Sequence, residues 1–76
     1  MQDSYLLTVL IGERVAASRE ELGLSRRSLA RRLGRSEAWL RRIEGGHARL
    51  TVDMAYRIAE ALRVDPCSLF GGLNVR

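Results

Sequence analysis

Apolar residues recur at helical spacing along most of the chain, and polar residues occupy the positions between them. This periodicity is typical of amphipathic helices that share one core. The first helix is expected from about Ser4 to Leu22 and ends at Gly23, a natural C-terminal stop. Its inward stripe is expected to consist of Leu7, Ile11, Val15 and Leu22.

Four shorter helices are predicted after it, opened by Ser25, Ser36, Thr51 and the pair Asp65-Pro66. Glycines close the second and third of them, at Gly34 and Gly45-Gly46. The expected inward residues are Leu29, Ala30, Leu33, Leu40, Ile43, Val52, Ala55, Ile58, Ala59 and Leu62. The short fifth helix carries Leu69 and Phe70. Arg63 is a weak point, because the end of the fourth helix favours glycine or asparagine in a left-handed conformation. No stretch alternates with period two, so the sequence predicts an all-α, five-helix bundle.

With 76 residues the chain has room for one domain, residues 1–76. Its single cysteine, Cys67, rules out an intramolecular disulfide and favours a reducing compartment. The apolar run Leu6–Ile11 is too short to span a bilayer and lacks the basic start of a signal peptide. We therefore expect a cytoplasmic protein that does not contact membranes.

Charge is distributed unevenly along the chain. All thirteen basic residues are arginine. Between Ser25 and Arg49, eight arginines face two acids, a net +6, whereas the remainder carries five arginines against seven acids, a net −2. This concentration indicates a nucleic acid as a polyanionic partner. Charge alone does not single out double-stranded DNA, which is expected from the arrangement of the second and third helices. The alternative is an arginine-rich composition that only solvates the helices.

The second and third helices are joined by only three residues, Gly34-Arg35-Ser36. A turn this short, with a glycine that can take positive φ, sets two helices at a steep angle. With Leu40 and Ile43 facing inward, the side chains expected to point outward are Glu37, Ala38, Arg41 and Arg42. The sequence thus predicts a helix-turn-helix between Arg26 and Gly46, with the later helix free to enter a DNA groove.

In these segments the chain resembles the phage Cro/repressor type of helix-turn-helix regulator. The resemblance covers a core of about residues 11–70, with an N-terminal helix extension at 4–10 and a tail at 71–76. Its most specific elements are Gly23-Leu24-Ser25, Leu29-Ala30, Leu33-Gly34-x-Ser36, Leu40-x-x-Ile43-Glu44-x-Gly46 and Ile58-Ala59-x-Ala61-Leu62. The chain departs from the family pattern at Ser18, Arg35 and Arg63, which replace a leucine, a small apolar residue and a glycine. The resemblance implies a lambda-repressor-like fold.

The resemblance also implies roles for single residues. Arg19 and Glu44 are expected to form a structural ion pair; the alternative is two exposed charges with little coupling. The expected contacts to DNA phosphates are Arg26, Arg27, Arg35, Ser36, Trp39, Gly46, His47 and Arg49. For Ser36 the alternative is a role only as a helix cap. For His47 the alternative is a solvated side chain without a contact to DNA.

Base contacts are expected from Glu37, Ala38, Arg41 and Arg42. Arginine binds guanine as a bidentate fork, glutamate accepts from cytosine N4, and alanine contacts a thymine methyl. For Glu37 the alternative is that it only complements the helix dipole.

A single domain of this kind contacts little DNA, and relatives commonly dimerise on a near-palindromic operator. Two apolar patches are candidate homodimer interfaces: Tyr5, Leu6, Val9 and Leu10 in the first helix, and Leu69, Phe70, Leu73 and Val75 near the C-terminus. Either patch could instead cover the monomer's own core. We favour the C-terminal region, assisted by the N-terminal extension.

The sequence favours a transcriptional repressor that occupies its operator as a dimer. The alternative is an antitoxin or a restriction–modification controller type of module that acts with a protein partner and binds DNA for autoregulation. An enzyme is not expected, because the chain has one histidine, one cysteine, no cluster of metal ligands and no glycine-rich phosphate loop followed by lysine. No cofactor and no small-molecule ligand are predicted.

Overall fold

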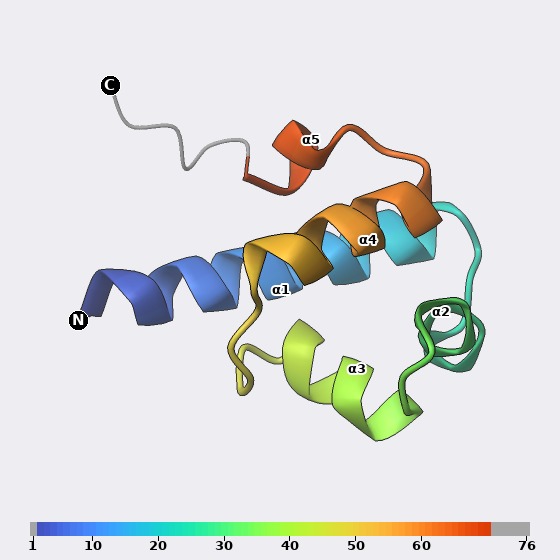
Figure 1. Cartoon of the computed structure of the whole chain (residues 1–76), viewed down its shortest axis with the longest axis horizontal. Coiled ribbons are helices and arrows are strands. Elements are labelled where there is room, and N and C mark those ends of the chain that lie inside the picture. Colours follow the sequence, from blue (N-terminus) through green and yellow to red (C-terminus); the bar gives the residue numbers. More distant parts are fainter. Residues whose placement is uncertain (1, 71–76) are drawn as a thin grey trace.

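The computed structural model describes the backbone of residues 2–70 and the side chains of residues 8–70. Throughout that part of the chain the regular secondary structure is helical, as the sequence predicts. The five helices, shown in Figure 1, are α1 (Gln2–Glu21), α2 (Arg26–Leu33), α3 (Glu37–Glu44), α4 (Val52–Leu62) and α5 (Pro66–Phe70). Only α1 differs noticeably from expectation, since it begins before Ser4.

The helices begin where the sequence places capping residues. The hydroxyl oxygens of Ser25, Ser36 and Thr51 each accept a hydrogen bond from the backbone N–H three residues later, at 3.0, 3.0 and 3.1 Å. The Asp65 carboxylate accepts from the N–H two residues later, at 2.9 Å. Each bond satisfies a donor that the first turn of a helix leaves unpaired. The predicted starts of α2 to α5 are therefore confirmed.

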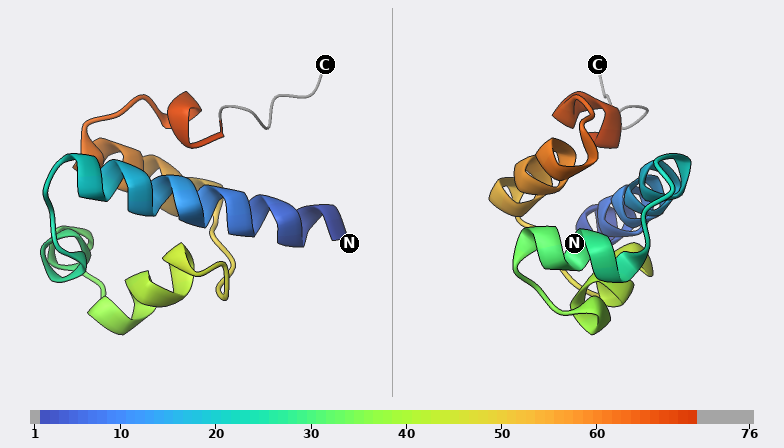
Figure 2. Two further views of the ribbon diagram at one scale, coloured as in Figure 1. Left: turned by 180° about the vertical axis from the view of Figure 1, so that it is seen from behind. Right: turned by 90° about the vertical axis from the view of Figure 1, so that its right-hand side faces the viewer.

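The helices enclose one core. α1 and α4 lie side by side, α2 and α3 pack on one side of them, and α5 lies on the other (Figures 1 and 2). Every helix contributes at least one fully buried side chain, and these are Val15, Leu29, Leu40, Ile43, Ile58, Leu62 and Leu69. Among the helices of residues 2–70, none combines the length and the apolar character needed to cross a membrane.

Two residues expected to face inward are exposed. Leu22 is 47% exposed, because α1 ends at Glu21 and Leu22 already lies in the following turn. Val52 is 68% exposed at the first position of α4, and the core position that we assigned to it is taken by Met54, which is 8% exposed. Leu7 lies among the residues whose side chains the structure does not describe.

The C-terminal patch proposed for dimerisation also needs correction. Leu69 has no exposed surface, because its side chain is part of the monomer's own core. Phe70 is half-buried and packs against that core. Leu73 and Val75 lie outside the described residues. Leu69 is therefore unavailable to a second chain.

Arg63 adopts the strained conformation that the sequence indicates. It ends α4 with φ 60° and ψ 39°, and it is the one non-glycine residue with positive φ among those described. Its backbone N–H bonds to the carbonyl of Glu60 at 3.1 Å, and that of Val64 to Ala59 at 3.0 Å. The helix end is therefore closed by hydrogen bonds although an L-residue is disfavoured there.

We predict that Arg63→Gly raises the free energy of unfolding by about 1 kcal/mol. This is the left-handed strain of an L-residue less the backbone entropy that glycine adds to the unfolded chain. Urea unfolding measures it. Gly34→Ala is the matched control, since Gly34 has φ 69° with no atom near its absent side chain, and it should lower stability. An unchanged or lower value for Arg63→Gly contradicts the strain.

Candidate nucleic-acid interface

The turn between α2 and α3 depends on the backbone conformation of Gly34. With φ 69° and ψ 29°, this residue lets the N–H of Arg35 bond to the carbonyl of Ala30 at 2.9 Å. A Cβ atom there would meet nothing within 4 Å, so the requirement is conformational and not steric. In Figure 1 α2 is seen nearly end-on while α3 runs across the picture, so the two helices meet at the predicted steep angle.

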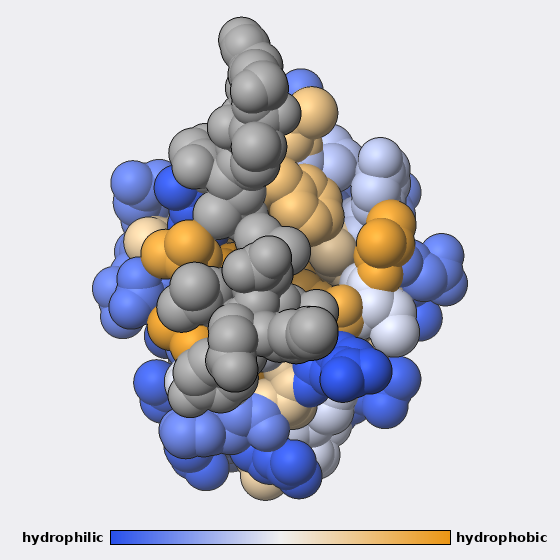
Figure 3. Space-filling view, turned by 90° about the vertical axis from the view of Figure 1, so that its left-hand side faces the viewer, coloured by the Kyte–Doolittle hydropathy of each residue, from blue (hydrophilic) through white to orange (hydrophobic). Residues whose placement is uncertain are grey.

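One side of α3 faces the core and the other faces solvent. Leu40 and Ile43 are 0% and 1% exposed and hold the helix against the bundle. All four residues predicted to contact bases are exposed: Glu37, Ala38, Arg41 and Arg42. The lower part of Figure 3, on the side where α3 lies, is covered mostly by hydrophilic side chains. The outer side of α3 is thus an arginine-bearing face exposed to solvent.

Two of the outward side chains interact with each other. Arg41 Nη2 donates to Glu37 Oε2 at 3.3 Å, one helical turn away. Their side chains are 59% and 45% exposed, so the pair is solvent-screened and contributes little to stability.

Seven of the eight residues predicted to contact phosphate have exposed surface. Arg27, Arg35, Ser36, His47 and Arg49 are exposed, and Arg26 and Trp39 are half-buried. The Arg35 guanidinium lies 5.1 Å from the centre of the Trp39 ring, a cation–π distance. This contact orients the charge in the turn and gives Trp39 a packing role within its own module.

Gly46 does not belong to the phosphate set. It is buried, and its N–H donates to the Ile43 carbonyl at 3.1 Å. A Cβ atom at this position would lie 2.9 Å from Val9 Cγ2, which shows that α1 packs directly on it. Its backbone donor is therefore used inside the protein.

A buried carboxylate joins the helix-turn-helix to α1. Glu44, with 4% of its side chain exposed, accepts from Arg19 Nε at 2.7 Å and from Arg19 Nη2 at 3.2 Å. Arg26 Nε donates to the same carboxylate at 2.8 Å. Arg19 also donates from Nη1 to the Leu24 carbonyl at 2.7 Å, and its Nη2 lies 3.7 Å from the exposed carboxylate of Glu20. We call Arg19, Arg26 and Glu44 the Glu44 cluster.

The Arg19–Glu44 ion pair predicted from the sequence is thus present. The alternative, two exposed charges with little coupling, is wrong. Arg19 is 7% exposed and Glu44 8% exposed as whole residues. Removing one partner of such a buried pair leaves the other charge uncompensated, at a cost of about 3–5 kcal/mol. The bond from Arg26 was not expected, because nothing in the sequence fixes the distance between α2 and the end of α3.

Gly12 is a second residue that sequence reasoning missed. It is buried in α1, and a Cβ atom there would collide with the carbonyl oxygen of Ile43 and lie 2.9 Å from that of Glu44. The backbone of α1 therefore touches the C-terminal end of α3. The available signal was a glycine within a helix, where it is otherwise unfavourable and indicates close packing.

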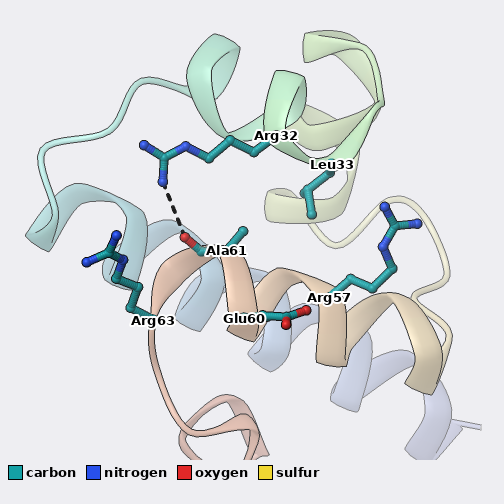
Figure 4. A pocket seen from close by; sticks show the side chains of 6 residues that line it. All are labelled: Arg32, Leu33, Arg57, Glu60, Ala61 and Arg63. Atoms are coloured by element: carbon teal, nitrogen blue, oxygen red, sulfur yellow. Dashed lines mark hydrogen bonds between the residues drawn. The ribbon is translucent and has the colours of Figure 1, made fainter.

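A shallow pocket of about 310 Å³ lies between α2 and α4 (Figure 4). It is lined by Arg32, Leu33, Arg57, Glu60, Ala61 and Arg63. Arg32 Nη1 donates to the Ala61 carbonyl at 3.4 Å, which places a positive charge at the C-terminal end of α4, whose own last turn has no basic residue. The pocket is thus part of the α2–α4 packing. Among the described residues, no group of three His, Cys, Asp or Glu side chains is placed to hold a metal ion.

Comparison with known protein families identifies the family to which this arrangement of helices belongs. A family model described as a helix-turn-helix domain matches residues 10–69. The chain belongs to the helix-turn-helix family. Among curated protein sequences, none matches this helix-turn-helix protein.

Solved structures agree with the family. The restriction–modification controller protein C.AhdI from Aeromonas hydrophila is 29% identical, with a TM-score of 0.83 over 90% of this chain and 99% of that one. An HTH_3 family transcriptional regulator from Vibrio cholerae is 26% identical, with a TM-score of 0.82 over 91% of this chain and 39% of that one. The clp gene regulator ClgR from C. glutamicum, 19% identical with a TM-score of 0.81 over 92% and 96%, shares the fold.

The helix-turn-helix protein therefore has the lambda-repressor-like fold that the resemblance implied. Its family is one of DNA-binding transcriptional regulators, which are not enzymes. The prediction of family, fold class and non-enzymatic character is confirmed.

We predict that Gly12→Ala lowers the free energy of unfolding by about 1–3 kcal/mol, because the added methyl group pushes α1 away from the carbonyls of α3. Helix propensity alone predicts the opposite sign, a gain of about 1 kcal/mol. Urea unfolding of the variant separates the two. A more stable Gly12→Ala protein contradicts the close approach of α1 and α3.

Proposed function

We propose that this helix-turn-helix protein is a sequence-specific transcriptional repressor that inserts α3 into the major groove of a near-palindromic operator as a homodimer. The observation that carries the proposal is the exposed outer face of α3, with Glu37, Ala38, Arg41 and Arg42 pointing away from the core. Occupation of the operator would block polymerase, and we place this activity in the cytoplasm.

The chemistry of the face supports reading of base edges. Arg41 and Arg42 each carry a planar fork that matches guanine O6 and N7, and Glu37 can accept from cytosine N4. Elsewhere in the helix-turn-helix and in the loop after it, Arg27, Arg35 and Arg49 are exposed cations that suit contact with the phosphates of a duplex. Base contacts provide specificity, and phosphate contacts provide register and most of the affinity.

A second candidate is a controller type of module that works with a protein partner and binds DNA for autoregulation, as an antitoxin does. The likeness to C.AhdI favours the controller role, because it extends over nearly the whole of both chains at 29% identity. Operator binding by the purified chain alone supports the repressor. Tight binding only in the presence of a co-purifying protein supports the second candidate.

The dimer is proposed because one domain contacts too little DNA for tight specific binding. Leu10 is 38% exposed in α1 and is available to a second chain, whereas Val9 is half-buried against Gly46. Tyr5 and Leu6 lie where side chains are not described. The proposed contact therefore involves Leu10 and the C-terminal region after Leu69.

We predict that selection of bound duplexes from a random pool yields a two-fold symmetric sequence, and that Arg42→Ala relaxes preference at one base position in each half-site. The expected loss on the selected duplex is about 1–3 kcal/mol. Arg31→Ala is the matched control on exposed α2 surface and should leave the preference unchanged. An equal loss for Arg42→Ala on every duplex would falsify base reading by Arg42.

We predict a mass of two chains in sedimentation or light scattering at tens of micromolar. Leu10→Glu should shift the population toward one chain without loss of helical content by circular dichroism, because a charge at an apolar interface is unfavourable. A wild-type mass of a single chain at that concentration contradicts the homodimer.

A further inference from the structure

The Arg26 side chain is held by one nitrogen and free at the other two. Its Nε donates to Glu44 Oε1 at 2.8 Å, and 39% of the side chain is exposed. Among the described residues, neither terminal nitrogen of Arg26 has a hydrogen-bond partner. A guanidinium has five N–H donors in a fixed plane, and the four on the terminal nitrogens remain for a ligand.

The carboxylate that holds Arg26 is itself bound by other groups. The Glu44 carboxylate is 4% exposed and is bound bidentately by Arg19, which is fixed in turn by the Leu24 carbonyl. Because the carboxylate is shared with Arg19, it compensates the charge of Arg26 only in part. Arg26 is therefore oriented without being neutralised.

We infer that Glu44 is a positioning residue for DNA binding, which orients Arg26 through Nε so that its terminal nitrogens bind a backbone phosphate. This rests on the proposed DNA-binding function and goes beyond the structural pairing with Arg19. A long side chain that is already ordered before binding loses less entropy when it meets its ligand. The buried carboxylate thus contributes to DNA affinity without contacting DNA.

The test is a double-mutant cycle of Glu44→Gln and Arg26→Ala, with binding to a non-selected duplex measured at several salt concentrations. All variants are compared at a temperature where circular dichroism shows them folded. Glu44→Gln should weaken binding about two- to tenfold beside Arg26, the affinity equivalent of ordering one long side chain. In the Arg26→Ala background it should have no effect. An equal loss in both backgrounds overturns the inference, because Glu44 would then act through the fold alone.

If Glu44→Gln does not fold, a second variant tests whether Glu44 orients Arg26. Arg26→Lys keeps the positive charge but has a single ammonium group. It therefore lacks a guanidinium whose Nε binds Glu44 while the terminal nitrogens bind a phosphate. It should weaken binding about two- to tenfold with an unchanged salt slope. Arg31→Lys, the same change on the same helix outside the proposed contacts, should bind like the wild type. Wild-type affinity in Arg26→Lys overturns the inference.

The outcomes also separate this inference from the proposed function. Arg26→Ala should reduce the slope of log affinity against log salt by about one, as expected for loss of one phosphate contact. If it does so while the cycle is additive, DNA binding stands and the role of Glu44 is rejected. If the wild type shows no salt-dependent binding to any duplex, both proposals are wrong.

Discussion

A single buried carboxylate determines how the helix-turn-helix sits on the rest of the protein. Glu44 at the end of α3 is bound by Arg19 from α1 and by Arg26 from the start of α2. These residues are 25 and 18 positions away from it in the sequence. Because the carboxylate and Arg19 are largely shielded from water, each requires the charge of the other, whereas Arg26, with 39% of its side chain exposed, adds a third contact from α2. These bonds bring segments of three helices together.

The backbone contact between α1 and α3 reinforces this arrangement. Gly12 brings the α1 backbone against the carbonyls of Ile43 and Glu44, next to the point where the carboxylate is bound. Leu40 and Ile43 in the core add to the contacts that set the rotation of α3 about its own axis. That rotation leaves the opposite side of α3 exposed, so the face that we propose for DNA contact follows from how the helix is anchored.

Local signals predicted most of the fold. Caps such as Ser36 and the left-handed Arg63 were predictable because hydrogen bonding and steric strain at helix ends depend on neighbouring residues. Leu22 and Val52 were misplaced because periodicity does not show whether another element covers the last or first turn of a helix. Leu69 was assigned to a dimer surface, since an apolar patch in a sequence fits either a partner or the monomer's own core.

The candidate site was likewise predictable where it depends on helical spacing, and not where it depends on contacts between separate elements. The outward position of Arg42 follows from helical spacing once Leu40 and Ile43 are placed in the core. The bond between Arg26 and Glu44 depends on how far two separate helices lie from each other, which no local pattern determines. Gly46 was assigned to phosphate because its loop resembles a family loop, but the use of its N–H by Ile43 is a property of this backbone.

The most direct measurement is an NMR titration of nitrogen-15-labelled protein with a selected duplex. The account predicts that the largest backbone shift changes fall on residues 37–42 of α3 and around the start of α2, while the Arg26 Nε–H signal stays protected from exchange by its bond to Glu44. Changes concentrated instead on the outer face of α4, around Val52 and Tyr56, would contradict the account. They would mean that the anchored helix does not present the DNA-binding surface.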